Sequence, residues 1–269
     1  MKISVIILNY KSQGHLRQCL RGLRDYGGQS ELEVIVIDNA SHDDSASVVK
    51  REYPSAAFHG LNENRGYAVG NNVGLKQSTG DLLMILNPDV AIFNGAIDRL
   101  ADYLHRHQQV GLVAPKLINP NGTVQMSGAM LPSFWMPLWR RSSLGHWPGP
   151  RQRIEKYFYR GWDRTTNRPI GWALGACFMF KRSAWQSVGD LDERFFMYFE
   201  DVDFCRRFWA AGWEVHYLAE AEMMHYLSRD SAVTPGLSGL FSYATRIHIN
   251  SWLKYAWKYR GQQKLPQQM

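Results

Sequence analysis

Three carboxylates stand within four residues in the second half of this 269-residue chain. Glu200, Asp201 and Asp203 follow the aromatic run Phe195 to Phe199 and precede two arginines. Acids this close repel one another and apolar neighbours desolvate them, and both effects raise a carboxyl pKa toward that of a general base. The same acids also suit the first turn of a helix, where the helix dipole and later arginines favour them. The cluster alone therefore fits a catalytic base or a helix start.

A second acidic position ends a strand-like segment at Asn87-Pro88-Asp89. A carboxylate on such a turn can hold Mg²⁺ or Mn²⁺, which take oxygen ligands and leave positions for water and diphosphate. His225 follows a later strand-like segment and could complete the coordination,. A single histidine is often only structural, so the metal-ligand and structural interpretations of His225 both stay open.

The first 90 residues alternate between β-rich apolar runs and helical stretches. Strands are expected at 3–10, 32–38, 56–61 and 81–86. Helices are expected around Leu16 to Leu23, through Val48 and Val49, and at 66–77. This order predicts an α/β fold with a doubly wound, mostly parallel sheet. Ligands of such sheets bind beyond the carboxyl ends of the strands, where this sequence places Asn9, Tyr10, Asp38, Asn87 and Asp89,.

Two nucleotide-binding classes are excluded at their key turns. The first strand is followed by no Gly-x-Gly-x-x-Gly, and the chain contains no Gly-x-x-x-x-Gly-Lys-Ser/Thr,. Glycines at 66, 70 and 74 recur every four residues along a helical pattern. We interpret them as close packing of that helix on the sheet rather than as a phosphate cradle.

The second half is less regular. Residues 127–168 form a long excursion rich in Trp, Pro, Gly and Arg, a composition shared by functional loops and disordered insertions,. A buried strand is expected at 171–180 and a short helix at 183–188. A helix at 203–211 and a strand at 213–218, leading to His225, complete the expected elements.

Composition narrows the class of protein. Lys and Arg number 31 against 24 Asp and Glu, which favours anionic partners such as nucleotides, diphosphates or acidic lipids,. No nucleic-acid-binding motif is present, so we expect no nucleic-acid partner. Cys19, Cys177 and Cys205 lack metal-type spacing and are expected to be reduced core thiols of a cytoplasmic protein,. We see neither a signal peptide nor a membrane span.

Taken together, these segments resemble the family 2 inverting glycosyltransferases of the GT-A fold, especially their rhamnosyltransferase-like branch. The similar segments run in order from the first strand to His225, and include 36–41, 64–72, 86–90, 175–180 and 196–203. The resemblance implies a domain at 1–230, with a nucleotide-binding half at 1–90 and an acceptor and catalytic half at 91–230 that contains the 127–168 excursion.

The resemblance also implies roles for individual residues. A nucleotide-diphospho-sugar donor would bind at Asn9, Tyr10, Asp38, Arg65, Gly66, Asn87 and Asp89. Asp89, with Mg²⁺ or Mn²⁺, would hold the donor diphosphate, in a chain where Asn87 replaces the first Asp of the family's Asp-x-Asp. Asp201 would be the general base, and Glu200 would orient the acceptor or share that task. The reaction would transfer a sugar, with L-rhamnose from dTDP-L-rhamnose as the expected donor, to a saccharide or lipid-linked glycan precursor.

Residues 231–269 are expected to form an amphipathic aromatic and basic helical tail. Its apolar positions include Leu237, Leu240, Phe241, Trp252 and Trp257, interleaved with Lys and Arg. Such a helix suits a membrane interface or a terminal helix packed on the core, and both alternatives stay open. The excursion could help to bind a lipid-linked acceptor through Trp135, Trp139, Arg140, Arg141 and Trp147. The alternative function is a non-catalytic nucleotide-sugar or glycan-binding module on the same fold.

Overall fold

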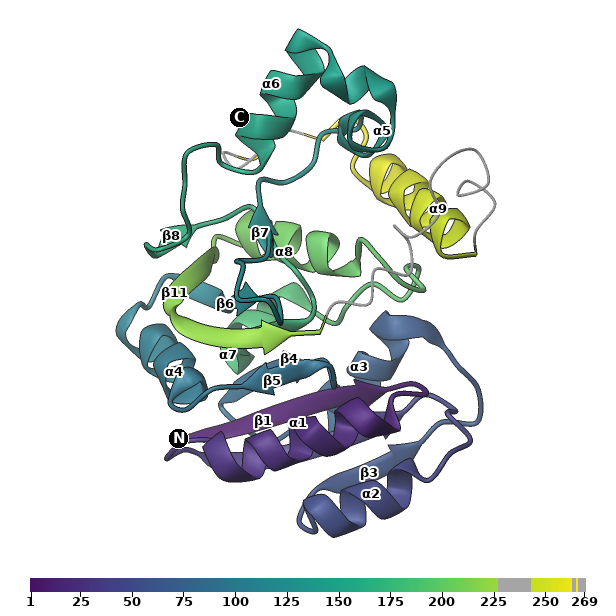
Figure 1. Ribbon diagram of the computed structural model, residues 1–269, viewed down its shortest axis with the longest axis vertical. Helices are drawn as coiled ribbons and strands as arrows, with labels where there is room; N and C mark the ends of the chain where they lie inside the picture. The colour runs from purple at the N-terminus through teal and green to yellow at the C-terminus, as the bar shows by residue number, and fades with distance from the viewer. Residues whose placement is uncertain (227–242, 263–264, 266–269) are drawn as a thin grey trace.

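The computed structural model describes residues 1–226, 243–262 and 265. Within these ranges nine strands form one sheet, in the order β3-β2-β1-β4-β10-β6-β11-β5, with β8 paired to β11 (Figure 1). The strands are β1 (Lys2–Asn9), β2 (Glu31–Asp38), β3 (Ala57–Gly60), β4 (Leu82–Leu86), β5 (Val90–Ile92), β6 (Val110–Ile118), β8 (Arg168–Pro169), β10 (Cys177–Lys181) and β11 (Glu214–His225).

The sheet confirms the expected mostly parallel α/β architecture. Strand β1 runs parallel to both β2 and β4, β3 is parallel to β2, and β11 is parallel to β6. Strand β10 lies antiparallel between β4 and β6. The carboxyl ends of β1, β2 and β4 therefore meet at one edge, which is where the candidate donor-binding residues were expected.

Helices cover both faces of the sheet. One core joins the sheet to α1 (Gln13–Tyr26), α2 (Ser45–Glu52) and α4 (Ala96–Arg106), and the other joins it to α3 (Gly66–Gln77), α7 (Arg182–Val188) and α8 (Glu200–Ala210). Strand β1 shows why: Ile3, Val5 and Ile7 enter the first core and Ile6 enters the second. Successive side chains of a strand point to opposite faces, so a continuous apolar run serves both.

The glycine series in α3 packs this helix closely on β1. A Cβ at Gly74 would stand 2.5 Å from Cγ2 of Ile6, and one at Gly70 would collide with Leu8. The expected packing role of these two glycines is therefore confirmed. Gly66 has φ +85°, and a Cβ there would meet the carbonyl oxygen of Phe196, so the turn into α3 requires glycine,.

Several expected elements differ in extent. The predicted strand at 171–180 is broken, because only β9 (Trp172–Ala173) and β10 are strands, and β9 pairs instead with β7 (Gly128–Ala129). Helix α8 begins at Glu200 rather than at Asp203, and β11 extends the predicted strand to His225. The ends of these elements depend on strand pairing with distant segments, so the local sequence predicts them less well than it predicts the elements themselves.

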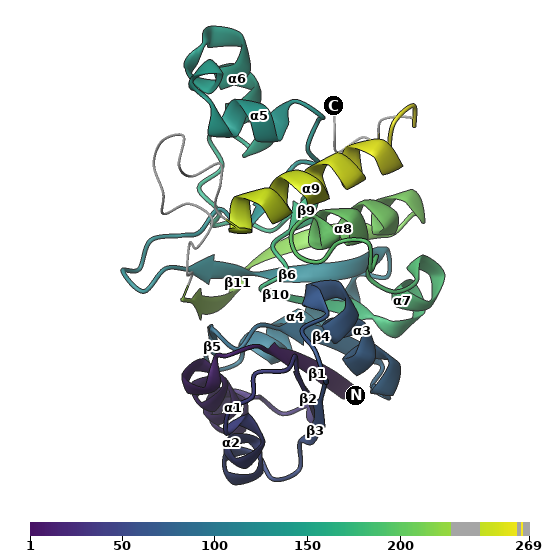
Figure 2. The same cartoon turned by 90° about the vertical axis from the view of Figure 1, so that its right-hand side faces the viewer.

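The excursion at 127–168 is folded. It contains α5 (Met136–Arg141), the 3₁₀ helix η1 (Ser143–His146) and α6 (Pro148–Tyr157). Helix α9 (Tyr243–Lys258) lies alongside α8, between α8 and the α5–α6 region (Figure 2). The tail positions Leu237, Leu240 and Phe241 lie outside the described residues.

The three cysteines are buried and free, as expected of core thiols. Among the helices that the structure describes, none is long and apolar enough to span a membrane.

Candidate active site

The ends of β1 and β2 are joined by side chains. The Asn9 amide, fully buried, donates from Nδ2 to Asp38 Oδ1 at 2.8 Å and to the hydroxyls of Ser41 and Ser45. Asp38 also accepts from the Ser41 backbone N–H at 2.9 Å and from the Ser41 hydroxyl at 2.5 Å. The sequence predicted Asn9 and Asp38 at one edge of the sheet. In the structure the Asn9 amide orients the Asp38 carboxylate through a hydrogen bond.

An open hollow of about 770 Å³ adjoins this pair. It is lined by Lys11, Ser12, Gln13, Gly14, His15, Gln18, Ser41 and Asp43. Tyr10 stands at the same strand end and is 41% exposed. This edge therefore offers an exposed aromatic ring, a lysine and hydroxyls around a buried carboxylate, which are groups suited to a nucleotide.

A second network connects β2 to the turn that begins α3. The Asn39 side chain donates to Asn64 Oδ1 at 2.8 Å and accepts from the Arg65 backbone N–H at 3.0 Å. Beyond it, the Tyr67 backbone N–H donates to the Phe196 carbonyl at 2.7 Å. The segment 64–67 thus links the donor-side edge to the aromatic turn that precedes Glu200, while the Arg65 side chain is exposed.

Asp201 is fixed by backbone groups. Its Oδ2 accepts from the Gly175 N–H at 3.0 Å and its Oδ1 from the Val202 N–H at 2.8 Å. The Tyr67 hydroxyl donates to the Gly175 carbonyl at 2.5 Å. Because the strand predicted at 171–180 is interrupted, the backbone of Gly175 is available for these contacts. Its N–H donates to Asp201 and its carbonyl accepts from Tyr67.

Glu200 and Asp201 are both buried, at 5% and 7% exposure. Burial raises the pKa of Asp201 to about 6, although the N–H groups of Gly175 and Val202 lower it in part. Burial also raises the pKa of Glu200 well above its usual value, and the neighbouring charge of Asp201 raises it further. Glu200 Oε2 has no hydrogen-bond partner among the described residues, so the backbone stabilises the ionised form of Asp201 better than that of Glu200,.

Asp89 and His225 come together at the end of β11. His225 Nε2 lies 3.4 Å from Asp89 Oδ2, and Asp89 Oδ1 is buried with no partner among the described residues. Gln125 gives its amide hydrogens to the His225 carbonyl and to Asn119 Oδ1, so its Oε1 faces His225 Nδ1 at 2.9 Å. Nδ1 therefore donates to Gln125, and Nε2 is the ring nitrogen that faces Asp89,.

This donor set fits a divalent cation. It offers an unpartnered carboxylate oxygen and an imidazole nitrogen whose ring is oriented by a hydrogen bond from Nδ1 to Gln125,. The described residues contain no cluster of three or more His, Cys, Asp or Glu side chains that could hold a metal. Asp89 and His225 could thus supply two ligands to a cation, with other positions open to water or anionic oxygens.

The Asn87–Asp89 turn and the candidate base Asp201 are linked through two adjacent residues. The Asn87 N–H donates to the Ala176 carbonyl at 2.8 Å, and Gly175, the residue before Ala176, holds Asp201. The Asp89 carbonyl accepts from the Tyr226 N–H at 2.9 Å, which ties the turn to the end of β11. The loop between β9 and β10 is therefore the common support of the Asn87–Asp89 turn and of Asp201.

Some of the supporting residues were not singled out from the sequence. Asn39, Asn64 and Tyr67 stand in segments that carried the resemblance, so a motif signal was present for them. Gly175 opens another such segment. Gln125 had no such signal, because it acts only through a histidine 100 residues away.

The sheet order and the acidic turn after β4 define the chain as a glycosyltransferase of the GT-A fold. It belongs to glycosyl transferase family 2, whose model matches residues 4–189, and the model of glycosyl transferase family group 2 matches residues 131–265. Among its relatives, N-acetylglucosaminyl-diphospho-decaprenol L-rhamnosyltransferase of Mycobacterium tuberculosis is 27% identical, over 98% of this chain and 87% of the relative. Low-salt glycan biosynthesis hexosyltransferase Agl10 of Haloferax volcanii is 26% identical, over 76% of this chain and 61% of the relative.

Solved structures show the same fold. Mannosyltransferase PcManGT from Pyrobaculum calidifontis, in complex with GDP-Man and Mn²⁺, superposes with a TM-score of 0.65 at 17% identity, over 99% of this chain and 66% of that one. TarS 1–349 of S. aureus gives a TM-score of 0.58 at 18% identity, over 84% of this chain and 60% of that one. This chain spans less than two thirds of either solved chain.

Proposed function

We propose that the chain transfers L-rhamnose from dTDP-L-rhamnose, with inversion, to a hydroxyl of a lipid-linked saccharide. The observation that carries the proposal is the β9–β10 loop, which fixes the candidate base Asp201 through Gly175 and the acidic Asn87–Asp89 turn through Ala176. The choice of sugar and acceptor draws on the Mycobacterium tuberculosis relative, because the similarity covers nearly the whole of this chain.

In this proposal the half at 1–90 of the 1–230 domain binds the donor, and the half at 91–230 supplies the acceptor side. Tyr10, the Asn9–Asp38 pair and the adjoining hollow would receive the nucleoside, with Arg65, Gly66 and Asn87 closer to the diphosphate. The buried Asp38 carboxylate and the exposed Tyr10 ring support this division, because a nucleoside offers both hydroxyls and a flat ring to recognise,.

Asp201 would act as the general base. Its carboxylate takes the proton of the acceptor hydroxyl as that oxygen bonds to the anomeric carbon. The bond between the anomeric carbon and the diphosphate oxygen breaks, and the nucleoside diphosphate leaves with the electron pair. Attack from the face opposite the leaving group inverts the anomeric centre. Asp201 accepts two backbone N–H hydrogen bonds, whereas Glu200 Oε2 has no partner among the described residues. This difference supports Asp201 as the ionised member of the pair and Glu200 as a residue that orients the acceptor through a hydrogen bond.

Asp89 and His225 would hold Mg²⁺ or Mn²⁺, which when bound supplies a Lewis acid against the charge of the departing diphosphate. Their proximity, the free Asp89 oxygen and the Gln125 support behind His225 favour this role. The neutral Asn87 carries no charge for the cation, so this chain would rely on fewer acidic ligands than an Asp-x-Asp sequence provides.

A lipid-linked acceptor would bring the chain to a membrane surface, and the region where the excursion meets α9 carries side chains that suit that contact. The excursion and α9 are joined there, since Trp252 donates from its indole N–H to the Phe134 carbonyl at 3.0 Å. Exposed apolar side chains on these segments are Phe134, Trp135, Leu138, Leu144, Trp147, Leu253 and Trp257. Arg140, Lys254 and Arg260, which belong to the same segments, are also exposed. Aromatic side chains mixed with cations fit an anionic lipid surface.

The function is tested by a panel of nucleotide-sugars with and without Mn²⁺, first by thermal shift and then by release of nucleoside diphosphate. We expect dTDP-L-rhamnose to raise the melting temperature most and to be turned over when an N-acetylglucosaminyl-diphospho-lipid is added. Stabilisation by the donor without turnover on any acceptor would instead support a binding module. Preference for another donor would overturn the rhamnose assignment.

A further inference from the structure

One face of α9 covers the segment that leads into the base. His248, Ser251, Tyr255 and Lys258 recur at intervals of three and four residues, which places them on one side of the helix,. The Ser251 hydroxyl donates to the Met197 carbonyl at 2.8 Å, and the rings of Tyr255 and Phe199 lie 5.4 Å apart. Helix α9 is therefore packed on the aromatic turn itself.

That turn is strained. Tyr198 and Phe199 both have φ +69°, in the left-handed region that bulky side chains rarely adopt,. Such a backbone persists only where its surroundings hold it. The ring of His248 lies 4.9 Å from that of Tyr198 and 5.4 Å from that of Phe199, beside the Ser251 hydrogen bond to Met197. Because Glu200 and Asp201 follow directly, the strained turn sets the direction in which α8 presents them.

Asp203 anchors the other end of this arrangement. Its side chain has no exposed surface, and its Oδ2 accepts from Arg207 Nε at 2.8 Å, as expected from their spacing. Its Oδ1 accepts from Lys258 Nζ at 2.5 Å and from the Tyr259 hydroxyl at 2.7 Å. Arg206 instead lies over the ring of Tyr259, with 4.1 Å between its guanidinium carbon and the ring centroid. Asp203 therefore joins α8 to the end of α9 and takes no part in the Glu200–Asp201 pair.

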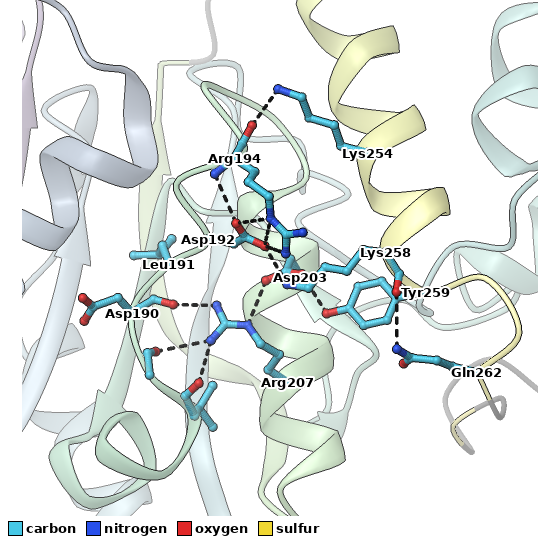
Figure 3. Close-up of polar contacts among 12 residues, drawn as sticks. Asp190, Leu191, Asp192, Arg194, Asp203, Arg207, Lys254, Lys258, Tyr259 and Gln262 are labelled. Carbon is cyan, nitrogen blue, oxygen red and sulfur yellow. Dashed lines mark hydrogen bonds and ion pairs between the residues drawn. The ribbon is translucent and has the colours of Figure 1, made fainter.

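Lys258 holds a second carboxylate, on the loop before the aromatic run. Its Nζ lies 2.7 Å from Asp192 Oδ2, as Figure 3 shows. Burial raises the pKa of Asp192, but hydrogen bonds from Arg194 and Lys258 outweigh that effect and hold it below its usual value. Lys254, one turn earlier, donates to the Arg194 carbonyl at 2.8 Å. One ammonium group thus ties Asp192 and Asp203, the residues that flank the strained turn.

We propose that Lys258 is a positioning residue for the reaction, which fixes the strained Tyr198–Phe199 turn and so aims Asp201 at the acceptor hydroxyl. The proposal rests on the proposed function of Asp201 as the base. Lys258 itself would touch neither donor nor acceptor. Its loss should therefore lower the rate of transfer and leave donor binding in the other half of the sheet unchanged.

The test compares K258M with R246M, which removes one positive charge from an exposed position of the same helix. Release of nucleoside diphosphate is measured with dTDP-L-rhamnose and an N-acetylglucosaminyl-diphospho-lipid. We expect kcat to fall roughly 30-fold in K258M, with the KM for donor within about twofold, and R246M to match the parent chain. K258R, whose guanidinium can donate to both carboxylates, should recover at least about a third of the parent kcat.

A normal kcat in folded K258M would overturn the proposal, as would an equal loss in R246M. If K258M does not fold, S251A decides, since it removes only the hydroxyl that holds Met197. A several-fold fall in kcat at constant donor KM supports the proposal there, and a normal kcat defeats it. D201N is measured in parallel: an active D201N defeats the proposed function, whereas an inactive D201N beside a normal K258M defeats the positioning role alone.

Discussion

The backbone N–H of Gly175 donates to Asp201 Oδ2 at 3.0 Å, so a residue from the β9–β10 loop fixes a carboxylate that lies 26 residues later in the chain. The same glycine accepts from the Tyr67 hydroxyl, and its neighbour Ala176 accepts from the Asn87 N–H. The donor-side turn and the candidate base are consequently held by one short piece of backbone.

Asp201→Asn should lower transfer roughly 10³-fold, because an amide cannot take the acceptor proton. Glu200→Gln should keep kcat within about tenfold, since a protonated Glu200 is already uncharged and is replaced by a group of the same shape. Steady-state kinetics of the two purified variants separates their roles. Equal losses in both would contradict the assignment of Asp201 as the single base.

Activity should fall as the pH drops through about 6, the raised pKa of Asp201. A protonated Asp201 cannot act as a base, so the acid limb of the kcat/KM profile should lie near that value. An acid limb near pH 4, the usual range of an exposed carboxyl, would show that Asp201 does not control the rate.

The same shift predicts how stability depends on pH. Folding raises the pKa of Asp201 from 3.8 to about 6, so the native state binds more protons than the unfolded state between these values. The free energy of unfolding should therefore decrease as pH rises through this window, by about 3 kcal/mol from this group. Urea unfolding at pH 4.5 to 7 measures the slope, which should become smaller in Asp201→Asn.

Gly175→Ala should impair transfer more than folding. An added Cβ would stand 3.1 Å from the Tyr67 hydroxyl and 3.3 Å from Asp201 Cβ, both tight contacts that the side chains must relieve by moving. We expect roughly a tenfold fall in kcat with a small change in melting temperature. Gly22→Ala in α1, where an added Cβ would come no closer than 3.8 Å to Ile92, is the matched control.

Metal dependence should trace to Asp89, His225 and the glutamine behind them. Chelation by EDTA and Asp89→Ala should each abolish transfer. Gln125→Ala should raise the Mn²⁺ concentration for half-maximal activity about 10- to 100-fold, because the ligating tautomer of His225 loses its support. Calorimetric titration with Mn²⁺ in the presence of nucleoside diphosphate checks this without turnover. Full activity in EDTA would remove the metal from the mechanism.

Membrane contact should depend on the aromatic face of the excursion and α9. Trp147→Ser and Trp257→Ser, at 63% and 66% exposed positions, should each weaken co-sedimentation with anionic vesicles roughly tenfold,. Tyr26→Ser, at a 48% exposed position of α1, is a control of similar exposure elsewhere on the surface. Equal binding by all three variants, or none by the parent chain, would contradict the lipid contact.

The sequence by itself determined the α/β architecture, because apolar runs and helical periodicities are local and the run of β1 shows on its own that both faces are buried. It also determined the candidate residues at the strand ends, since parallel strands bring their carboxyl ends to one edge. The acidic cluster could be recognised as a catalytic base or a helix start, and its spacing to the later arginines indicated the ion pair of Asp203 with Arg207,.

Only the tertiary structure decided how these groups are held. Gly175 lies within the strand predicted at 171–180. That strand is interrupted because β9 pairs with β7 and because the Gly175 N–H donates to Asp201, and neither contact is local in the sequence. Gln125 reaches His225 across 100 residues, and Lys258 reaches Asp203 across 55. Residue types and their spacing in the sequence indicate which side chains can take part in catalysis or binding. Their hydrogen-bond partners come from distant segments, and only the folded chain brings those segments together.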